Sequence, residues 1–341
     1  MMDLLKSRWW PVLVATGLLA LAGCGPSAPL QRLQYQGGAL GTSYSIILYT
    51  EGTRDFSRQI DSVFAAMNHS MSTYLPDSDI SRINRGDSTL VVDDMFREVF
   101  EASRNIWEAS GGYFDPTVGV LVDAWGFGPG AALEMDSLRV DSLLAYVGFE
   151  KVSLGADNRI RKALPQVRLD FNAIAKGYSI DRLALLFDQA GIAHYLIEVG
   201  GEVRARGGNP EKKQPWRIGI DDPQVTDGRA IKRVIALEDR SMASSGNYRK
   251  FRIDPETGAK FVHTIDPLTG FTRSSNILAA SVLAPTCMAA DGYATTFMAM
   301  DLEASQKLLA EHDELEAYII YLDADGTVRE FMTPGFEALI R

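Results

Sequence analysis

A carboxylate and a hydroxyl lie four residues apart in the segment MAADGYATTF, within a stretch whose apolar spacing predicts a helix from Met288 to about Met300. Residues four apart share one face of a helix, so Asp291 and Thr295 would point the same way. Two hard oxygen donors, with waters and substrate phosphates in the remaining positions, suit Mg²⁺. The alternative is a hydroxyl that bonds back to its own helix, beside a solvated or capping carboxylate.

The segment RLDFNAIAKGYSIDRLA places a carboxylate before a second predicted helix and an ammonium in its first turn. Asp170 would end a strand over 167–171, and Lys176 would follow the start of a helix over 174–190. Free N–H groups and the positive dipole end there favour an anion, and a nearby ammonium adds to that attraction. The plainer interpretation is that Asp170 and Asn172 only cap the helix.

A histidine is a candidate proton acceptor. His263, in FVHTIDPLTG, lies on a predicted strand that runs into a Pro/Gly turn. Its imidazole titrates near neutrality, so it could take a proton from an incoming hydroxyl, although an ordinary packing or surface role is the alternative. The other histidines, His69, His194 and His312, lie in periodic segments, and we assign them structural roles.

Aromatic and polar side chains gather in predicted loops. The run GGYFDP supplies Tyr113, Phe114 and Asp115, and Tyr74 lies in MSTYLPDSDISRIN. A flat heteroaromatic ligand needs such faces and polar edges, although loop aromatics also serve plain packing. The segment Ala243–Tyr248, ASSGNY, is either a ligand loop or a turn.

The elements that must position these residues follow no regular βαβ order, which favours an α+β fold over a doubly wound parallel sheet. The glycine-rich connection Gly111–Gly130 is long, as binding loops often are. Periodicity predicts helices over 60–71, 95–106, 138–147, 174–190, 288–300 and 302–312, and strands over 41–50, 151–154, 167–171, 194–199, 202–206, 216–220, 231–237, 261–265, 277–283, 317–322 and 328–331.

Composition excludes several classes of protein. The 341 residues are 46% hydrophobic, enough for one large or two ordinary domains. The formal net charge of −10 is the opposite of what a sequence-independent nucleic-acid binder needs, so no nucleic-acid partner is expected. Two cysteines, Cys24 and Cys287, make neither a disulfide framework nor a Cys-rich metal site. Cys287 lies beside the predicted metal helix, where we expect it to pack.

The N-terminal residues have the pattern of a targeting segment. Basic residues precede an apolar run, Trp9–Ala22, which is short for a membrane span but suits a signal peptide. The run ends in LAGC, which resembles a bacterial lipobox with Cys24 as the lipidated residue; an ordinary signal peptide with a chance cysteine is the alternative. We therefore predict a lipoprotein signal peptide over 1–23, a lipidated tether over 24–39, and one folded domain over 40–341.

Taken in order, a set of motifs closely resembles the FAD:protein FMN transferases, the ApbE family of flavin transferases. The resemblance covers about residue 36 to the C-terminus and implies a T-fold-like α+β architecture that binds FAD and a divalent ion, usually Mg²⁺. The motifs are LGTSYSI, MSTYLPDSDISRIN, GGYFDPTVGVLVDAWGFG, LDFNAIAKGYSIDRLA, IEVGGEVRARG, SSGNY, HTIDPLTG and APTCMAADGYATTFMAMD.

The resemblance also implies an activity and a location. Such enzymes cleave the pyrophosphate of FAD, join FMN through a phosphoester to a Thr or Ser hydroxyl of a target protein, and release AMP. Typical acceptors resemble subunits of Na⁺-translocating NADH:quinone reductases and Rnf-type complexes. Members are typically periplasmic and often lipid-anchored, commonly at the inner membrane. Two alternatives remain: an FAD pyrophosphatase that gives FMN and AMP, and a non-catalytic flavin-binding lipoprotein.

Site residues are carried over by the same resemblance. The metal ligands would be the Ala173 carbonyl and the side chains of Asp291 and Thr295, and His263 would be the base. Leu40 stands where relatives often have Met, which leaves an apolar contact. The FAD contacts would be Leu40, Tyr74, Tyr113, Phe114, Asp115, Asp170, Lys176 and Ile265.

Overall fold

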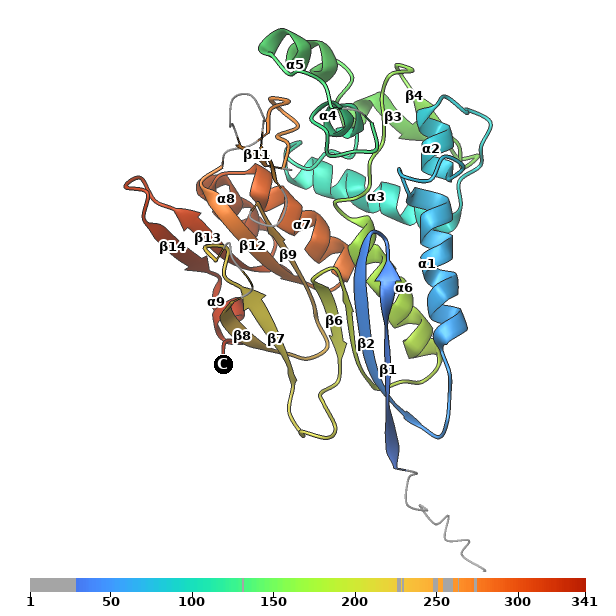
Figure 1. Cartoon of the computed structure of the whole chain (residues 1–341), viewed down its shortest axis with the longest axis vertical. Helices are drawn as coiled ribbons and strands as arrows, with labels where there is room; N and C mark the ends of the chain where they lie inside the picture. Colours follow the sequence, from blue (N-terminus) through green and yellow to red (C-terminus); the bar gives the residue numbers. More distant parts are fainter. Residues whose placement is uncertain are drawn as a thin grey trace, which may run out of the picture.

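The structure is a computed structural model that describes residues 29–130, 132–225, 228, 230–247, 251–253, 260–262, 264–272 and 275–341. Its centre is an eight-stranded sheet in the order β1-β2-β5-β6-β9-β12-β13-β14, in which every neighbouring pair is antiparallel (Figure 1). The strands are β1 (Leu30–Ala39), β2 (Thr42–Glu51), β5 (His194–Val199), β6 (Glu202–Arg206), β9 (Ser241–Gly246), β12 (Ile277–Ala284), β13 (Glu316–Leu322) and β14 (Val328–Met332).

Helices cover one face of this sheet. Two apolar clusters join the sheet to α1 (Ser57–Met71), α3 (Asp94–Ala109), α6 (Ala175–Gln189), α7 (Cys287–Ala299) and α8 (Leu302–Glu311). The amphipathic spacing seen in the sequence explains this arrangement, because the apolar stripe of each helix must be removed from water. The helix that carries Asp291 is thereby held against the centre of the sheet.

The opposite face is covered by a hairpin and a short helix. Strands β7 (Trp216–Asp221) and β8 (Ile231–Leu237) pair antiparallel, and α9 (Pro334–Glu337) lies beside them (Figure 1). Trp216, Tyr318 and Phe336 are almost completely buried between these elements and the sheet. The sheet is therefore buried on both faces, which fixes the strand ends that lead into the candidate site.

Smaller elements gather at the upper end of the molecule in Figure 1. They are α2 (Asp79–Asn84), α4 (Gly119–Ala124), α5 (Ser137–Leu144), a 3₁₀ turn (Phe149–Lys151), β3 (Val152–Leu154) and β4 (Ile160–Lys162), and a further strand pair is β10 (Phe251–Ile253) with β11 (Lys260–Val262). The indole N–H of Trp125 donates to the Gly270 carbonyl at 2.9 Å, which ties α4 to the segment after β11.

The α+β prediction is confirmed, and most predicted elements occur within a few residues of their expected bounds. Three predictions were wrong. Residues 167–171 form no strand and only an isolated bridge, Val118 to Arg168. The connection Gly111–Gly130 contains α4. Ser244 and Ser245 lie in the central strand β9, not in a turn.

The folded chain begins earlier than the tether boundary at residue 39 suggests. Leu30–Ala39 is β1, paired with β2 along its whole length. Two residues with positive φ, Leu40 at 52° and Gly41 at 73°, form the tight turn between these strands. Residues 1–28, with Cys24 and the apolar run, lie outside the described residues. Of the helices that are described, none is long and apolar enough to cross a membrane.

Candidate active site

The carboxylate and hydroxyl of α7 face the sheet side by side. Between Ala290 and Met300 every residue is buried except Thr295, whose side chain reaches a partly open space. Its Oγ1 lies 3.5 Å from the Ser245 hydroxyl of β9, too long for a strong hydrogen bond. The bond back to the helix is made by its neighbour instead, since Thr296 Oγ1 donates to the Gly292 carbonyl at 2.8 Å. The hydroxyl that bonds back to its own helix is therefore that of Thr296, and the Thr295 hydroxyl is left available to a ligand.

Asp291 is tied to the start of α6. Its Oδ2 accepts a hydrogen bond from the Gly177 amide at 2.9 Å. In a regular helix that amide would donate to the carbonyl four residues earlier, which belongs to Ala173. Because α6 begins at Ala175, that carbonyl lies before the helix, and the Gly177 amide is one of the first N–H groups of α6, which Asp291 satisfies. Asp291 is thus fixed against the start of α6, which follows Ala173 in the chain, and Thr295 lies one helical turn further along α7.

Glycine at position 177 is required by the close approach of α6 and α7. A Cβ atom there would lie 2.2 Å from the Cys287 carbonyl oxygen and 2.8 Å from Asp291 Cβ. Both distances are far below van der Waals contact, so any side chain would push the helices apart. In the AKGYS segment, Gly177 is therefore needed for helix packing, next to the ammonium of Lys176.

A second carboxylate positions α7 from outside the site. Asp181 of α6 accepts hydrogen bonds from the Cys287 and Met288 amides at 2.9 and 2.8 Å, and Arg204 donates to it at 2.8 Å. A carboxylate at a helix N-terminus is stabilised by the helix dipole and satisfies free amides. The sequence analysis missed this role, because the two residues that meet are 106 positions apart.

Lys176 lies between two buried carboxylates. Its ammonium is 2.6 Å from Glu202 Oε1 and 3.7 Å from Asp291 Oδ1. Burial alone would lower the pKa of Lys176, but the Asp291 and Glu202 carboxylates outweigh burial and raise it, so the side chain is charged. The sequence predicted an ammonium that is free to bind an anion. In the structure its charge is already paired with these carboxylates.

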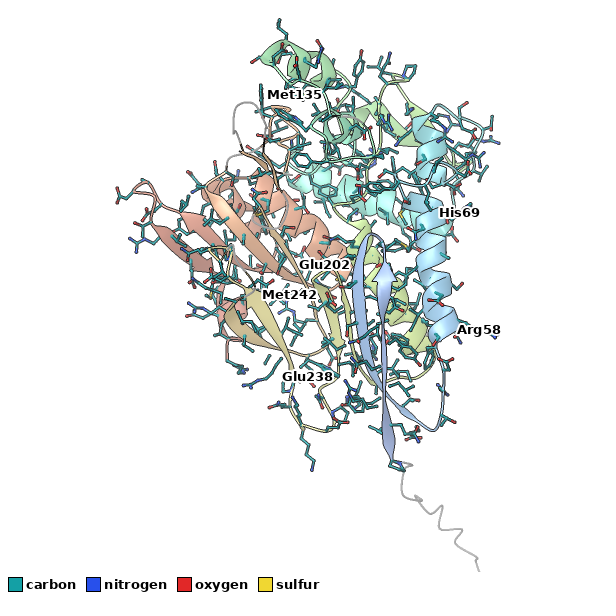
Figure 2. The ribbon with its side chains drawn as sticks, in the orientation of Figure 1. Arg58, His69, Met135, Glu202, Glu238 and Met242 are labelled. Carbon is teal, nitrogen blue, oxygen red and sulfur yellow. The ribbon has the colours of Figure 1, made fainter. Side chains whose placement is uncertain are left out.

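Glu202 is a site residue that the sequence analysis did not single out. It begins β6 directly after Gly200 and Gly201, whose positive φ values of 64° and 108° form a turn that few other residues adopt. Its side chain is only 4% exposed, and Figure 2 labels it at the centre of the molecule. The double glycine in the quoted motif IEVGGEVRARG was the available signal.

The raised pKa of Asp291 is consistent with a carboxylate that binds a cation. Burial raises the pKa of its carboxyl to about 7, Lys176 opposes that shift, and Glu202 adds to it. A metal ligand must be deprotonated, so a bound cation would displace this proton. Two carboxylates and one ammonium leave a net negative charge that a divalent ion would offset.

The donor set fits Mg²⁺ better than a softer metal. In the part of the chain that the structure describes, no three His, Cys, Asp or Glu side chains come together as a metal cluster. One carboxylate, one hydroxyl and one carbonyl are hard oxygen donors, too few for a closed cage, and Mg²⁺ commonly completes its shell with waters and substrate phosphates. The residues present therefore fit the ion that the resemblance implies.

The tip of the β1–β2 hairpin lies at the edge of this site. Leu40 is partly buried and packs against both apolar clusters on the helical face. Thr42, two residues further on, lies close to the Gly200 turn, since a Cβ at Gly200 would be 2.9 Å from Thr42 Cγ2 and 3.3 Å from Glu202 Oε2. Leu40 is thus held where an apolar ligand contact is feasible.

Tyr74 and Asp170 lie near each other, as a shared ligand would require. Tyr74 is 57% exposed, its hydroxyl donates to the Phe127 carbonyl at 3.3 Å, and its pKa is raised by burial and by the Asp170 charge. Asp170 is buried and accepts from the Asn172 amide at 2.7 Å. It does not cap α6, which begins at Ala175 after the N-cap residue Ile174 and has no side-chain cap. The capping interpretation was therefore wrong.

The loop Tyr113–Asp115 offers its backbone more than its side chains. The Phe114 ring is buried in the core, so the expectation of an aromatic face was wrong for this residue. The Asp115 carboxylate accepts from the Thr117 amide at 2.7 Å, the Thr117 hydroxyl at 2.5 Å and the Phe149 amide at 3.0 Å. Tyr113 is only partly buried and packs against the core.

A cavity of about 570 Å³ opens beside this loop. Its walls include Trp107, Gly112, Asp115, Pro267 and Leu268. The volume is in the range of small-molecule pockets. Ile265, two residues before Pro267, is buried and forms an isolated bridge with Thr272. The strand predicted over 261–265 ends at Val262, earlier than expected.

The structure describes three of the four histidines. His69 lies on α1 (Figure 2), His194 contacts the Gly208 carbonyl at 3.0 Å, and His312 contacts Glu314 at 2.9 Å, so these three have surface or structural surroundings. His263, the candidate base, lies outside the described residues, as does Tyr248.

An antiparallel sheet packed against helices, with a buried carboxylate and a hydroxyl one turn apart on α7 beside the start of α6, defines an α+β protein with a candidate divalent-cation site. The ApbE family model matches residues 40–319. The chain belongs to the ApbE family.

Relatives and solved structures agree with this assignment. The chain is 34% identical over 323 residues to the FAD:protein FMN transferase of Haemophilus influenzae, covering 91% of this chain and 92% of that protein. It is 33% identical over 341 residues to the enzyme of that name from Vibrio cholerae, covering 98% and 99%. The solved flavin transferase ApbE from Vibrio cholerae superposes with a TM-score of 0.80 at 31% identity, covering 91% of this chain and 100% of that chain.

Proposed function

We propose that the protein is an Mg²⁺-dependent FAD:protein FMN transferase that attaches FMN to a Thr or Ser hydroxyl of a target protein and releases AMP. The transferase activity of the relatives named above supports this activity. The observation that supports the metal dependence is the buried Asp291 carboxylate, which the Gly177 amide ties to the start of α6, with the Thr295 hydroxyl one helical turn away on α7.

The reaction exchanges the phosphoanhydride linkage of FAD for a phosphoester linkage to the acceptor. A bond forms between the acceptor oxygen and the FMN phosphorus, the pyrophosphate bond to adenylate breaks, and the hydroxyl proton passes to a base. His263 is the proposed base. When bound, Mg²⁺ would neutralise phosphate charge and assist the departure of AMP. Asp291, Thr295 and the Ala173 carbonyl would hold it, and the other residues orient the reactants.

Binding of FAD would use the surfaces around this centre. At the start of α6 the Ala175 amide donates to the Phe171 carbonyl at 2.8 Å and the Gly177 amide to Asp291 at 2.9 Å, so the pyrophosphate would depend on the cation more than on these amides. Leu40 and Tyr74 would contact the ligand with their side chains. The loop Tyr113–Asp115 would contact it mainly through its backbone, because Asp115 already accepts three hydrogen bonds.

The proposed setting is the periplasm, with a lipid anchor on Cys24 in the inner membrane, where members of the family commonly act. FAD carries its own activated pyrophosphate, so the reaction needs no ATP outside the cytoplasm. Acceptors would resemble subunits of Na⁺-translocating NADH:quinone reductases or Rnf-type complexes.

The test is to incubate the purified protein with FAD, Mg²⁺ and an acceptor peptide of the type Asp-x-x-(Ser/Thr)-Gly-Ala-(Ser/Thr). Mass spectrometry should find FMN added to the hydroxyl residue, in an amount equal to the AMP released. The Asp291→Asn variant should lose this product. AMP release that does not depend on the acceptor would instead identify an FAD pyrophosphatase, and recovery of unmodified FAD would identify a flavin-binding protein.

A further inference from the structure

The Lys176 ammonium has two candidate carboxylate partners and bonds firmly to only one. It lies 2.6 Å from Glu202 Oε1, a full charge-assisted hydrogen bond, and 3.7 Å from Asp291 Oδ1, a looser contact. A lysine has a flexible four-carbon stem and three N–H donors, so its position is set by the acceptors around it. Within the described residues, these are the two carboxylates at salt-bridge distance from it.

A lysine paired with Asp291 would compete with a cation for the same oxygen. The ammonium would have to leave before the carboxylate could act as a ligand, and like charges repel at that distance. A residue that holds the ammonium aside removes this competition. Glu202 is placed to do so, because it approaches Lys176 from β6 while Asp291 approaches from α7.

Glu202 has two features that packing alone does not explain. Its side chain is 4% exposed, yet Oε2 has no hydrogen-bond partner among the described residues. Buried polar atoms are normally paired, so a half-satisfied carboxylate calls for a specific reason. The Gly200–Gly201 turn, with its positive φ values, directly precedes Glu202 and fixes where β6 begins.

We propose that Glu202 is a positioning residue that holds the Lys176 ammonium away from Asp291 and so keeps that carboxylate free for a divalent cation. The inference rests on the proposed cation site at Asp291. It assigns Glu202 no direct contact with the cation. The two carboxylates and the ammonium together carry a charge of −1, which a divalent ion converts to +1, a sign suited to bound phosphates.

The experiment measures Mn²⁺ binding to the mature chain by calorimetry without FAD. Glu202→Gln should weaken binding about tenfold, because Lys176 then pairs with Asp291. The double variant Lys176→Met with Glu202→Gln has the wild-type charge of the cluster and no competing ammonium, so its affinity should return to within about threefold of wild type. Glu330→Gln is the matched control, since it breaks a comparable 2.7 Å ion pair with Arg233 far from the site and should leave binding unchanged.

Each other outcome has a defined meaning. A double variant as weak as Glu202→Gln would show that Glu202 acts on the cation directly, and an unchanged Glu202→Gln would show that it does not position Lys176; either result overturns the proposal. If Asp291→Asn binds Mn²⁺ as wild type does, the proposed cation site itself fails.

A second measurement covers the case in which Glu202→Gln does not fold. Glu202→Asp keeps the charge but shortens the side chain by one methylene, and should give an intermediate loss of Mn²⁺ affinity. A metal-free crystal structure of either variant should show the Lys176 ammonium moved to within about 3 Å of an Asp291 oxygen. An ammonium that stays at its wild-type distance from Asp291 would refute the proposal.

Discussion

Replacing Gly177 with alanine should separate the two helices that form the site. The new Cβ would lie 2.2 Å from the Cys287 carbonyl oxygen and 2.8 Å from Asp291 Cβ, where ordinary contact begins near 3.4 Å. Both neighbours belong to α7 and one of them is backbone, so neither can rotate away. The helices must therefore part by about 1 Å.

Two costs follow from that movement. Overpacking a buried contact costs about 1–3 kcal/mol of the free energy of unfolding. The hydrogen bond from the Gly177 amide to Asp291, now 2.9 Å, would lengthen past its useful range and leave a buried oxygen unpaired, which costs about another 1–3 kcal/mol. Because the same movement shifts Asp291 from the Ala173 carbonyl, FMN transfer should fall about 100-fold.

Urea denaturation, Mn²⁺ calorimetry and the transfer assay would measure these three effects. The matched control is Gly292→Ala on α7, whose Cβ would clash with the flexible end of Ile106 at 2.5 Å and meet the Ile174 side chain at ordinary contact distances of 3.7 and 3.8 Å. That side chain can rotate, so the control should lose little stability and keep Mn²⁺ binding. If Gly177→Ala kept both the stability and the Mn²⁺ affinity of wild type, helix spacing would not be what positions Asp291.

Three further predictions concern single groups. Thr295→Val should weaken Mn²⁺ binding and slow transfer, whereas Thr296→Val, which removes only a bond back to the helix, should leave both nearly unchanged; calorimetry and the transfer assay on the two variants would distinguish them. Because burial raises the pKa of Asp291 to about 7, Mn²⁺ affinity should rise about tenfold per pH unit from pH 5 to 7 and level off above it, and a flat profile by calorimetry would contradict this. Asp115→Asn should lower the free energy of unfolding by about 2–3 kcal/mol in urea denaturation, since an amide group would face donors from Thr117 and Phe149; an unchanged midpoint would show that these bonds are dispensable.

The sequence predicted the parts of the site that depend on local spacing. Asp291 and Thr295 lie on one face of a helix because they are four residues apart, and Lys176 lies in the first turn of α6 because the apolar pattern marks where that helix begins. Such inferences need only the helical repeat. The α+β class could be predicted for the same reason, from the order of periodic segments.

The parts that depend on contacts between distant segments could not be predicted. Glu202 meets Lys176 across 26 residues, and Asp181 meets the start of α7 across 106. The sequence places Phe114 in a loop, but its ring is buried in the core. Only the tertiary structure determines where such a ring packs. Strand β1 was missed because its exposed edge position allows a mostly polar sequence.

The most direct test of the account is a crystal structure of the protein grown with FAD and Mn²⁺, with the metal located by anomalous scattering. The account predicts one strong peak within about 2.0–2.3 Å of an Asp291 oxygen, the Thr295 hydroxyl and the Ala173 carbonyl, in contact with the pyrophosphate of the ligand. A peak at other side chains, or FAD bound with its phosphates far from Asp291, would contradict it.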